Sequence, residues 1–198
     1  MSKSIEIQVL EKIKRSPRGV LFFVGSFAGI ANSKSANKAL ERLVRSGEIE
    51  RVAQGIYVRP VIDNYIGKVL PGIEEIAVAI AKRDRAKIIP TGSYGMYKLG
   101  LTTQVPLNIV FYTDTSARKI KIGKQTINFK KASSKNLAFV GEISTLAIQA
   151  LRTIGKDEVT AEEVKQIKKV LKNENLKNLQ HDLLLAPVWI RKLIEDNG

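Results

Sequence analysis

Four polar side chains between residues 33 and 45 could contact a polyanion together. Lys34, Asn37, Lys38 and Arg42 follow one another at intervals of three or four residues, which is the spacing of side chains on one side of a helix. Amide and guanidinium groups make paired hydrogen bonds to base edges, so Asn37 and Arg42 are the candidates for reading a nucleotide sequence. The lysines are candidates for phosphate contacts. These residue types therefore favour binding of nucleic acid.

Further residues extend this candidate site. Ser33 and Ser35 stand near the expected start of the helix, where hydroxyl and free N–H groups can bind a phosphate oxygen. The full set of predicted DNA-binding residues is Ser33, Lys34, Ser35, Asn37, Lys38, Arg42, Arg45, Arg51, Gln54 and Arg59. Within it, the predicted phosphate contacts are Lys34, Lys38, Arg51 and Arg59. A solvated helix face rich in Lys and Arg is the alternative interpretation.

The opposite face of the same segment is apolar. Its residues recur at helical spacing: Ala36, Ala39, Leu40, Leu43 and Val44. Such a stripe predicts an amphipathic helix that buries one side. Asn32 or Ser33 can cap its first turn, and Gly47 stands where a left-handed residue commonly ends a helix.

A hairpin and two shorter elements complete an N-terminal pattern. Two β-prone runs, 49–52 and 56–59, are separated by Ala53-Gln54-Gly55, and Gly55 can take the positive φ of a tight turn. Before the basic helix, the sequence predicts a helix over 5–13, a short apolar strand or core segment over 21–24, and a brief helix that Ser26 caps. This order of helix, strand, helix, turn, helix and hairpin predicts a winged helix-turn-helix.

The rest of the chain reads as a mixed segment followed by helices. Residues 60–72 are expected to form a connector. The expected helices are 73–82, a short one up to Leu99, 143–154, 160–171, 176–185 and 188–194, and the expected strands are 87–90, 107–112, 119–122 and 126–130. Thr160-Ala161-Glu162-Glu163 has the spacing of a capping box, which opens the helix that ends at Leu171. The predicted fold class is α+β: an N-terminal winged helix-turn-helix over 1–60, then a second domain over 61–198. That domain combines a mixed α/β segment over 61–135 with a helical C-terminal tail over 136–198.

The amino-acid composition also favours a polyanion as the partner. The 198 residues carry a net charge of +14, and 44% of them are hydrophobic, so a real core is expected. Residues 1–60 hold 11 basic and 5 acidic side chains, residues 61–135 hold 13 and 5, and residues 136–198 hold 9 and 9. A basic surplus confined to the first two thirds favours a polyanion there.

The chemistry available elsewhere is restricted. Cysteine is absent and His181 is the only histidine, so disulfides and thiolate metal sites are excluded, and we expect neither a metal nor a cofactor. His181 is expected to pack or to face a partner. Because the sequence shows no signal peptide and no run of about 18 apolar residues, we expect a soluble cytoplasmic protein with no membrane partner.

Three segments resemble a known family. They are the helix end Ala39–Gly47, the hairpin Ala53–Tyr57, and the run from Gly92-Ser93 through Leu99-Gly100-Leu101-Thr102-Thr103-Gln104-Val105-Pro106. They are similar to the AbiEi-like antitoxins of type IV toxin–antitoxin systems, in a DUF6088-like branch. The resemblance implies a transcriptional autorepressor that binds double-stranded DNA at its own operator. It also implies a functional partner, a nucleotidyltransferase-like toxin that is opposed without a tight complex.

Two other interpretations stay open. A Gly92-Ser93 turn before a helix and a strand resembles the opening of nucleotidyltransferase folds, but the strand at 107–111 has no carboxylate, and Asp114 follows only after it. Because two-metal catalysis needs close carboxylate ligands, we predict a protein that is not an enzyme. The alternative is a nucleotidyltransferase-fold enzyme or an RNA-binding protein using the central segment.

A third hypothesis is an interaction module whose helical tail docks a partner. The lysines near the predicted central hairpin either extend the DNA footprint or protect an edge strand. They are Lys119, Lys121, Lys124, Lys130 and Lys131.

Overall fold

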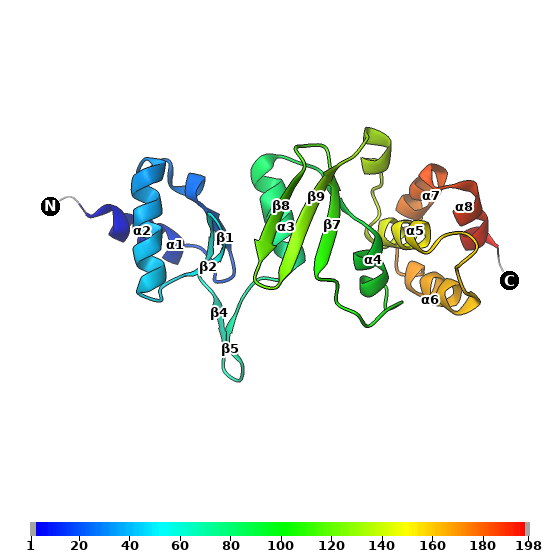
Figure 1. Ribbon diagram of the computed structural model, residues 1–198, viewed down its shortest axis with the longest axis horizontal. Coiled ribbons are helices and arrows are strands. Elements are labelled where there is room, and N and C mark those ends of the chain that lie inside the picture. Colours follow the sequence, from blue (N-terminus) through cyan, green and yellow to red (C-terminus); the bar gives the residue numbers. More distant parts are fainter. Residues whose placement is uncertain (1–2, 197–198) are drawn as a thin grey trace. The chain divides into compact units, whose positions relative to one another are not determined.

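The computed structural model describes residues 3–196 and has a mixed α+β fold. Within that range it contains eight α-helices, two short 3₁₀ helices and three β-sheets (Figure 1). This confirms the predicted α+β class. The chain divides into two compact units, Met1–Ile80 and Ala81–Gly198, whereas the sequence placed a boundary at residue 60.

The first unit surrounds a small three-stranded sheet. Its elements are α1 (Ile5–Lys14), β1 (Leu21–Phe23), the 3₁₀ helix η1 (Val24–Phe27), α2 (Ser33–Arg45), β2 (Glu50–Ala53) and β3 (Ile56–Val58). The strand order is β1-β3-β2, and both pairs are antiparallel. The helices α1 and α2 pack together (Figure 1). One apolar core joins α1, α2 and the sheet, and its largest buried side chains include Ile13, Phe27, Leu40, Leu43 and Ile49.

The ends of α2 agree with the sequence. Asn32 is the N-cap, and its Oδ1 accepts a hydrogen bond of 2.9 Å from the Ser35 N–H. At the other end Gly47 has φ +76°, and the next residue, Glu48, donates from its N–H to the Leu43 carbonyl at 3.1 Å. The chain thus turns away at once, as a left-handed residue after a helix allows.

The predicted cap at Ser26 is wrong in detail. Ser26 lies inside η1, and its hydroxyl accepts from the Phe23 N–H at 3.0 Å. The segment is therefore a short 3₁₀ helix that the Ser26 side chain closes, and Ser26 does not cap an α-helix.

The expected connector after β3 contains a second hairpin, formed by β4 (Val61–Asp63) and β5 (Gly67–Val69). Asp63 Oδ1 accepts from the N–H groups of Tyr65 at 2.8 Å and Ile66 at 3.0 Å, so the turn is held by one carboxylate. Lys68 Nζ lies 2.5 Å from Glu50 Oε1 of β2. This contact joins the hairpin to β2 of the first unit.

The helix α3 (Ile73–Asp84) crosses the boundary between the units. The remaining elements are β6 (Ile88–Pro90), α4 (Gly92–Lys98), β7 (Asn108–Thr113), β8 (Arg118–Ile122), β9 (Gln125–Lys131), the 3₁₀ helix η2 (Ser134–Leu137), α5 (Glu142–Ile154), α6 (Ala161–Leu171), α7 (Leu176–Leu185) and α8 (Val188–Glu195). The sheet order is β6-β7-β9-β8, with β7 and β9 parallel and the other pairs antiparallel. The helices and strands predicted beyond residue 72 are confirmed, with ends shifted by one or two residues.

The helix α5 is the centre of the second unit. All residues from Ser144 to Leu151 are buried, and α5 packs against α4, α6 and α7 (Figure 1). Gly95 permits the close approach of α4, because a Cβ there would lie 3.1 Å from the Leu146 carbonyl oxygen.

Two carboxylates from distant parts of the chain cap the start of α5. Asp182 of α7 accepts from the N–H groups of Val140 and Gly141, both at 2.9 Å, and from the Ser144 hydroxyl at 2.6 Å. Glu174 accepts from the N–H groups of Ile143 at 2.7 Å and Ser144 at 3.0 Å. Negative charge is favourable at a helix N-terminus, so this pair satisfies free N–H groups and the helix dipole together.

The environment of Asp182 acts on its pKa in two directions. Burial raises the pKa, but hydrogen bonds from the Ser144 hydroxyl, the His181 ring and two backbone N–H groups lower it, and the net pKa lies below the ordinary value of 3.8. The ionised carboxylate is therefore the form that the fold stabilises.

We expect Asp182→Asn to lower the free energy of unfolding by about 2–4 kcal/mol near pH 7, because its NH₂ group would face donors where the carboxylate accepts. The lowered pKa stabilises the fold above the pKa of the unfolded chain, and this stabilisation is lost as pH falls through the folded pKa. The difference between variant and wild type should therefore shrink in acid. Urea denaturation over a pH series measures it, with exposed Asp157→Asn as the control. Equal stability of wild type and Asp182→Asn at neutral pH would contradict this role.

Candidate nucleic-acid interface

The two faces of α2 separate charge from apolar surface. Ala36, Ala39, Leu40 and Leu43 are buried, with at most 3% of any of them exposed. The exposed residues on the other side include Lys34, Lys38, Arg42 and Arg45, and Asn37 is half-buried beside them. The structure therefore brings the predicted cations of this helix to one accessible face.

Two carboxylates modify that face. The Arg42 guanidinium lies 3.5 Å from Glu6 Oε2 of α1, yet 66% of the Arg42 side chain stays exposed. An exposed pair of this kind is worth at most about 1 kcal/mol, so a phosphate can replace Glu6. Glu41 is exposed between Lys38 and Arg45 in the same row, and it weakens the positive potential there.

The hairpin of β2 and β3 adds two exposed polar side chains. Arg51 is exposed on β2 opposite Tyr57 of β3, and Gln54 is exposed at the turn, where Gly55 has φ +71°. Burial raises the pKa of Tyr57, Arg51 lowers it and Glu41 raises it further. Tyr57 belongs to the same apolar core as Leu40 and Leu43, so the hairpin and α2 share that core.

Arg59 takes a different position from the other candidates. Its Nη2 donates to the Ser16 carbonyl at 3.0 Å and its Nη1 to the Lys14 carbonyl at 3.4 Å, and its buried Nε has no hydrogen-bond partner. These contacts hold β3 to the end of α1. The guanidinium that the sequence assigned to phosphate is thus turned into the protein.

The two serines at the start of α2 differ in accessibility. The Ser33 side chain is exposed, whereas Ser35 is half-buried and its N–H is bound by the Asn32 side chain. Ser33 and Lys34 are therefore the positions at this end that remain accessible to a phosphate.

The central segment places no carboxylate on β7. Along that strand Ile109, Phe111 and Thr113 are buried, and Asp114 accepts from the Lys87 N–H at 3.0 Å just after it. Ser93 lines a shallow groove with apolar neighbours such as Met96 and Val105. Among residues 3–196, no group of three or more His, Cys, Asp or Glu side chains could hold a metal ion.

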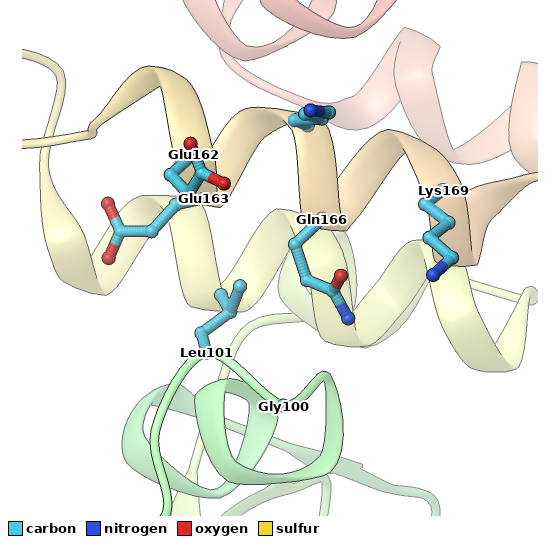
Figure 2. A pocket seen from close by; sticks show the side chains of 7 residues that line it. Gly100, Leu101, Glu162, Glu163, Gln166 and Lys169 are labelled. Carbon is cyan, nitrogen blue, oxygen red and sulfur yellow. The ribbon is translucent and has the colours of Figure 1, made fainter.

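A second groove lies between α6 and the loop after α4 (Figure 2). Gln166 points from α6 toward this loop, and its Nε2 donates to the Leu99 carbonyl at 3.3 Å. Glu163 is engaged with Thr160 in the predicted capping box, which is confirmed. The lining contains no Ser, Thr, Cys or His, and its charged side chains are Glu162, Glu163, Lys165 and Lys169.

The profile of a protein family described as "Family of unknown function (DUF6088)" matches residues 8–179. The chain belongs to the DUF6088 family. The match begins in α1 and ends in α7, so the family includes parts of both compact units. A search of curated proteins gave no match.

Within the part of this DUF6088 protein that the structure describes, no helix is long and apolar enough to cross a membrane.

The residues predicted to bind DNA did not include polar side chains of the four-stranded sheet, such as Asn108, Thr126 and Asn128. The alternation of polar and apolar residues along 118–131 is the signal that could have found Thr126 and Asn128, whereas Asn108 lies outside that segment. It does not by itself give the order of the strands.

We expect Arg59→Ala to destabilise the first unit by about 1–3 kcal/mol, because two backbone carbonyls lose a charged donor. Exposed Arg51→Ala should change the free energy of unfolding by no more than about 0.5 kcal/mol. Chemical denaturation of both variants measures the difference. Equal stabilities would show that the Arg59 contacts add nothing to the fold.

Proposed function

We propose that this DUF6088 protein is a DNA-binding transcriptional repressor with an N-terminal winged helix-turn-helix, and that it acts as a type IV antitoxin. The observation that supports it most is the row of exposed cations on α2, opposite a buried apolar stripe and beside the hairpin that bears Arg51 and Gln54. In this proposal α2 is the recognition helix and β2–β3 is the wing.

The dimensions of α2 suit a major groove. Its 13 residues extend for about 20 Å at a rise of about 1.5 Å per residue, and B-DNA admits a helix in a groove about 12 Å wide. Lys34 and Lys38 then contact phosphate. Arg42 releases the Glu6 carboxylate and contacts a base edge or a phosphate instead. Asn37 contributes its accessible amide.

The antitoxin part of the proposal rests on the resemblance of the three segments to AbiEi-like proteins. The run Leu99–Pro106 connects α4 with β7 and includes residues that line the groove beside Ser93. The partner implied is a nucleotidyltransferase-like toxin, opposed without a tight complex. The enzyme alternative is less well supported, because the residues of β7 offer no carboxylate ligand.

We expect Lys34→Ala with Lys38→Ala to weaken binding to the duplex upstream of the gene by about tenfold or more. If the wild type neutralises roughly five phosphates, the slope of log affinity against log salt is about −4.5, and the double variant should flatten it by about 2. Fluorescence anisotropy over a salt series measures both quantities.

Two further variants sharpen this experiment. Glu41→Gln should raise the affinity, because it removes a negative charge from the proposed contact face. Lys172→Ala with Lys177→Ala removes the same charge from exposed positions of the second unit and should leave the affinity unchanged. No binding by the wild type, or equal losses in both lysine pairs, would reject the repressor assignment.

For the antitoxin assignment, we expect co-expression with a nucleotidyltransferase-like protein encoded beside this gene to restore growth that the partner alone arrests. The Lys34→Ala and Lys38→Ala variant, expressed from an unrelated promoter, should still restore growth, because operator binding and neutralisation are separate activities in this proposal. Growth arrest that persists with the wild-type chain would remove the antitoxin assignment and leave the repressor assignment standing.

A further inference from the structure

The register of the four-stranded sheet aligns polar residues across three strands. Lys119 of β8 is paired with Asn128 of β9, which is paired with Val110 of β7. One step along, Lys121 is paired with Thr126, which is paired with Asn108. Directly paired residues share one face of a sheet, so both rows lie on the same side.

Helices cover only one half of this face. At the β6 side, Ile89 is 4% exposed, and half-buried Tyr112 packs against the same core. The helices α4 and α5 supply that cover, because Met96 of α4 and Leu146 of α5 belong to the same core. Toward β8 the side chains are exposed or half-buried. We call this half the open face; it comprises Asn108, Lys119, Lys121, Thr126, Asn128 and Lys130.

The other face of the sheet is mainly apolar. Ile109, Phe111, Ile127 and Phe129 are at most 2% exposed. Arg118 lies 5.1 Å from the centre of the Phe129 ring and pairs with Asp84. By contrast, Lys119 and Lys121 form no ion pair within residues 3–196. The charges of the open face are therefore uncompensated.

The surrounding segment adds to this imbalance. Residues 81–135 contain 12 basic and 2 acidic side chains. The two acids are engaged elsewhere, Asp84 with arginines and Asp114 with the Lys87 N–H. A polyanion is the partner whose charge complements this surface.

Edge protection explains only part of the pattern. Lysines on an edge strand discourage pairing with other strands, which accounts for Lys119 and Lys121 on β8. Lys130 lies on β9, which is paired on both sides by β7 and β8. The amides of Asn108 and Asn128 on internal strands do nothing for an edge, so a different role is needed.

We propose that the open face binds single-stranded nucleic acid, with the lysines on phosphates and Asn108, Thr126 and Asn128 at base edges. The edges of unpaired bases are directly accessible to amides and hydroxyls, whereas in a duplex those edges are reached only through a groove. This site is separate from the duplex contact proposed for α2. Tyr112 is the only aromatic residue in the rows that adjoin it, so binding depends mainly on phosphate contacts and varies steeply with salt.

The test is anisotropy of the full-length chain with labelled oligonucleotides of about 20 uridines or about 20 thymidines. We expect both to bind, and Lys119→Gln with Lys121→Gln to weaken binding about tenfold. The same variant should flatten the salt slope by about 1.4, as two lost contacts to a single strand require. A higher affinity for the uridine strand would identify RNA as the ligand, and a higher affinity for the thymidine strand would identify DNA.

Matched variants separate this proposal from the proposed repressor function. Lys172→Gln with Lys177→Gln should leave single-strand binding unchanged, and Lys34→Ala with Lys38→Ala should weaken only duplex binding. The proposal is overturned if the wild type does not bind single strands, or if the Lys119 and Lys121 variant binds them as the wild type does. It is also overturned if the α2 variant loses single-strand binding.

Discussion

The burial of one apolar stripe determines how α2 can act. Ala36, Leu40 and Leu43 are fixed in the core of the first unit, so the helix cannot rotate, and its cations must point outward. Burial of the Leu40 and Leu43 side chains contributes about 1.5–3 kcal/mol each, more than the surface pair of Arg42 and Glu6 can supply. Packing thus sets the direction of the charges, and weak ion pairs leave those charges available to a ligand.

In the second unit, too, one buried helix determines which surface stays exposed. Its central helix α5 is almost entirely buried, and its first turn is satisfied by Asp182 and Glu174 from later in the chain. With that helix fixed, α4 and α5 cover one half of a sheet face and leave the basic half open. The uneven charge of the chain therefore has two structural locations, one in each unit, and we propose a different form of nucleic acid as the ligand of each.

The sequence predicted those features that depend on neighbours in the chain. Helical and alternating periodicities located the elements of the second unit, and the capping residues Asn32 and Thr160 marked helix starts. The β4–β5 hairpin escaped prediction because its apolar side chains Val61, Ile62 and Ile66 are exposed, so its sequence shows no pattern of a strand with one buried face. The inward turn of Arg59 and the cap by Asp182 involve partners about 40 residues away, which no local pattern encodes.

The most direct test of the central claim is backbone amide NMR of the labelled chain during titration with duplex DNA from upstream of its gene. If α2 and the β2–β3 hairpin form the contact, the largest shift changes fall on residues 33–42 and 51–55. Changes confined to residues beyond 80, or none at all, would contradict the account.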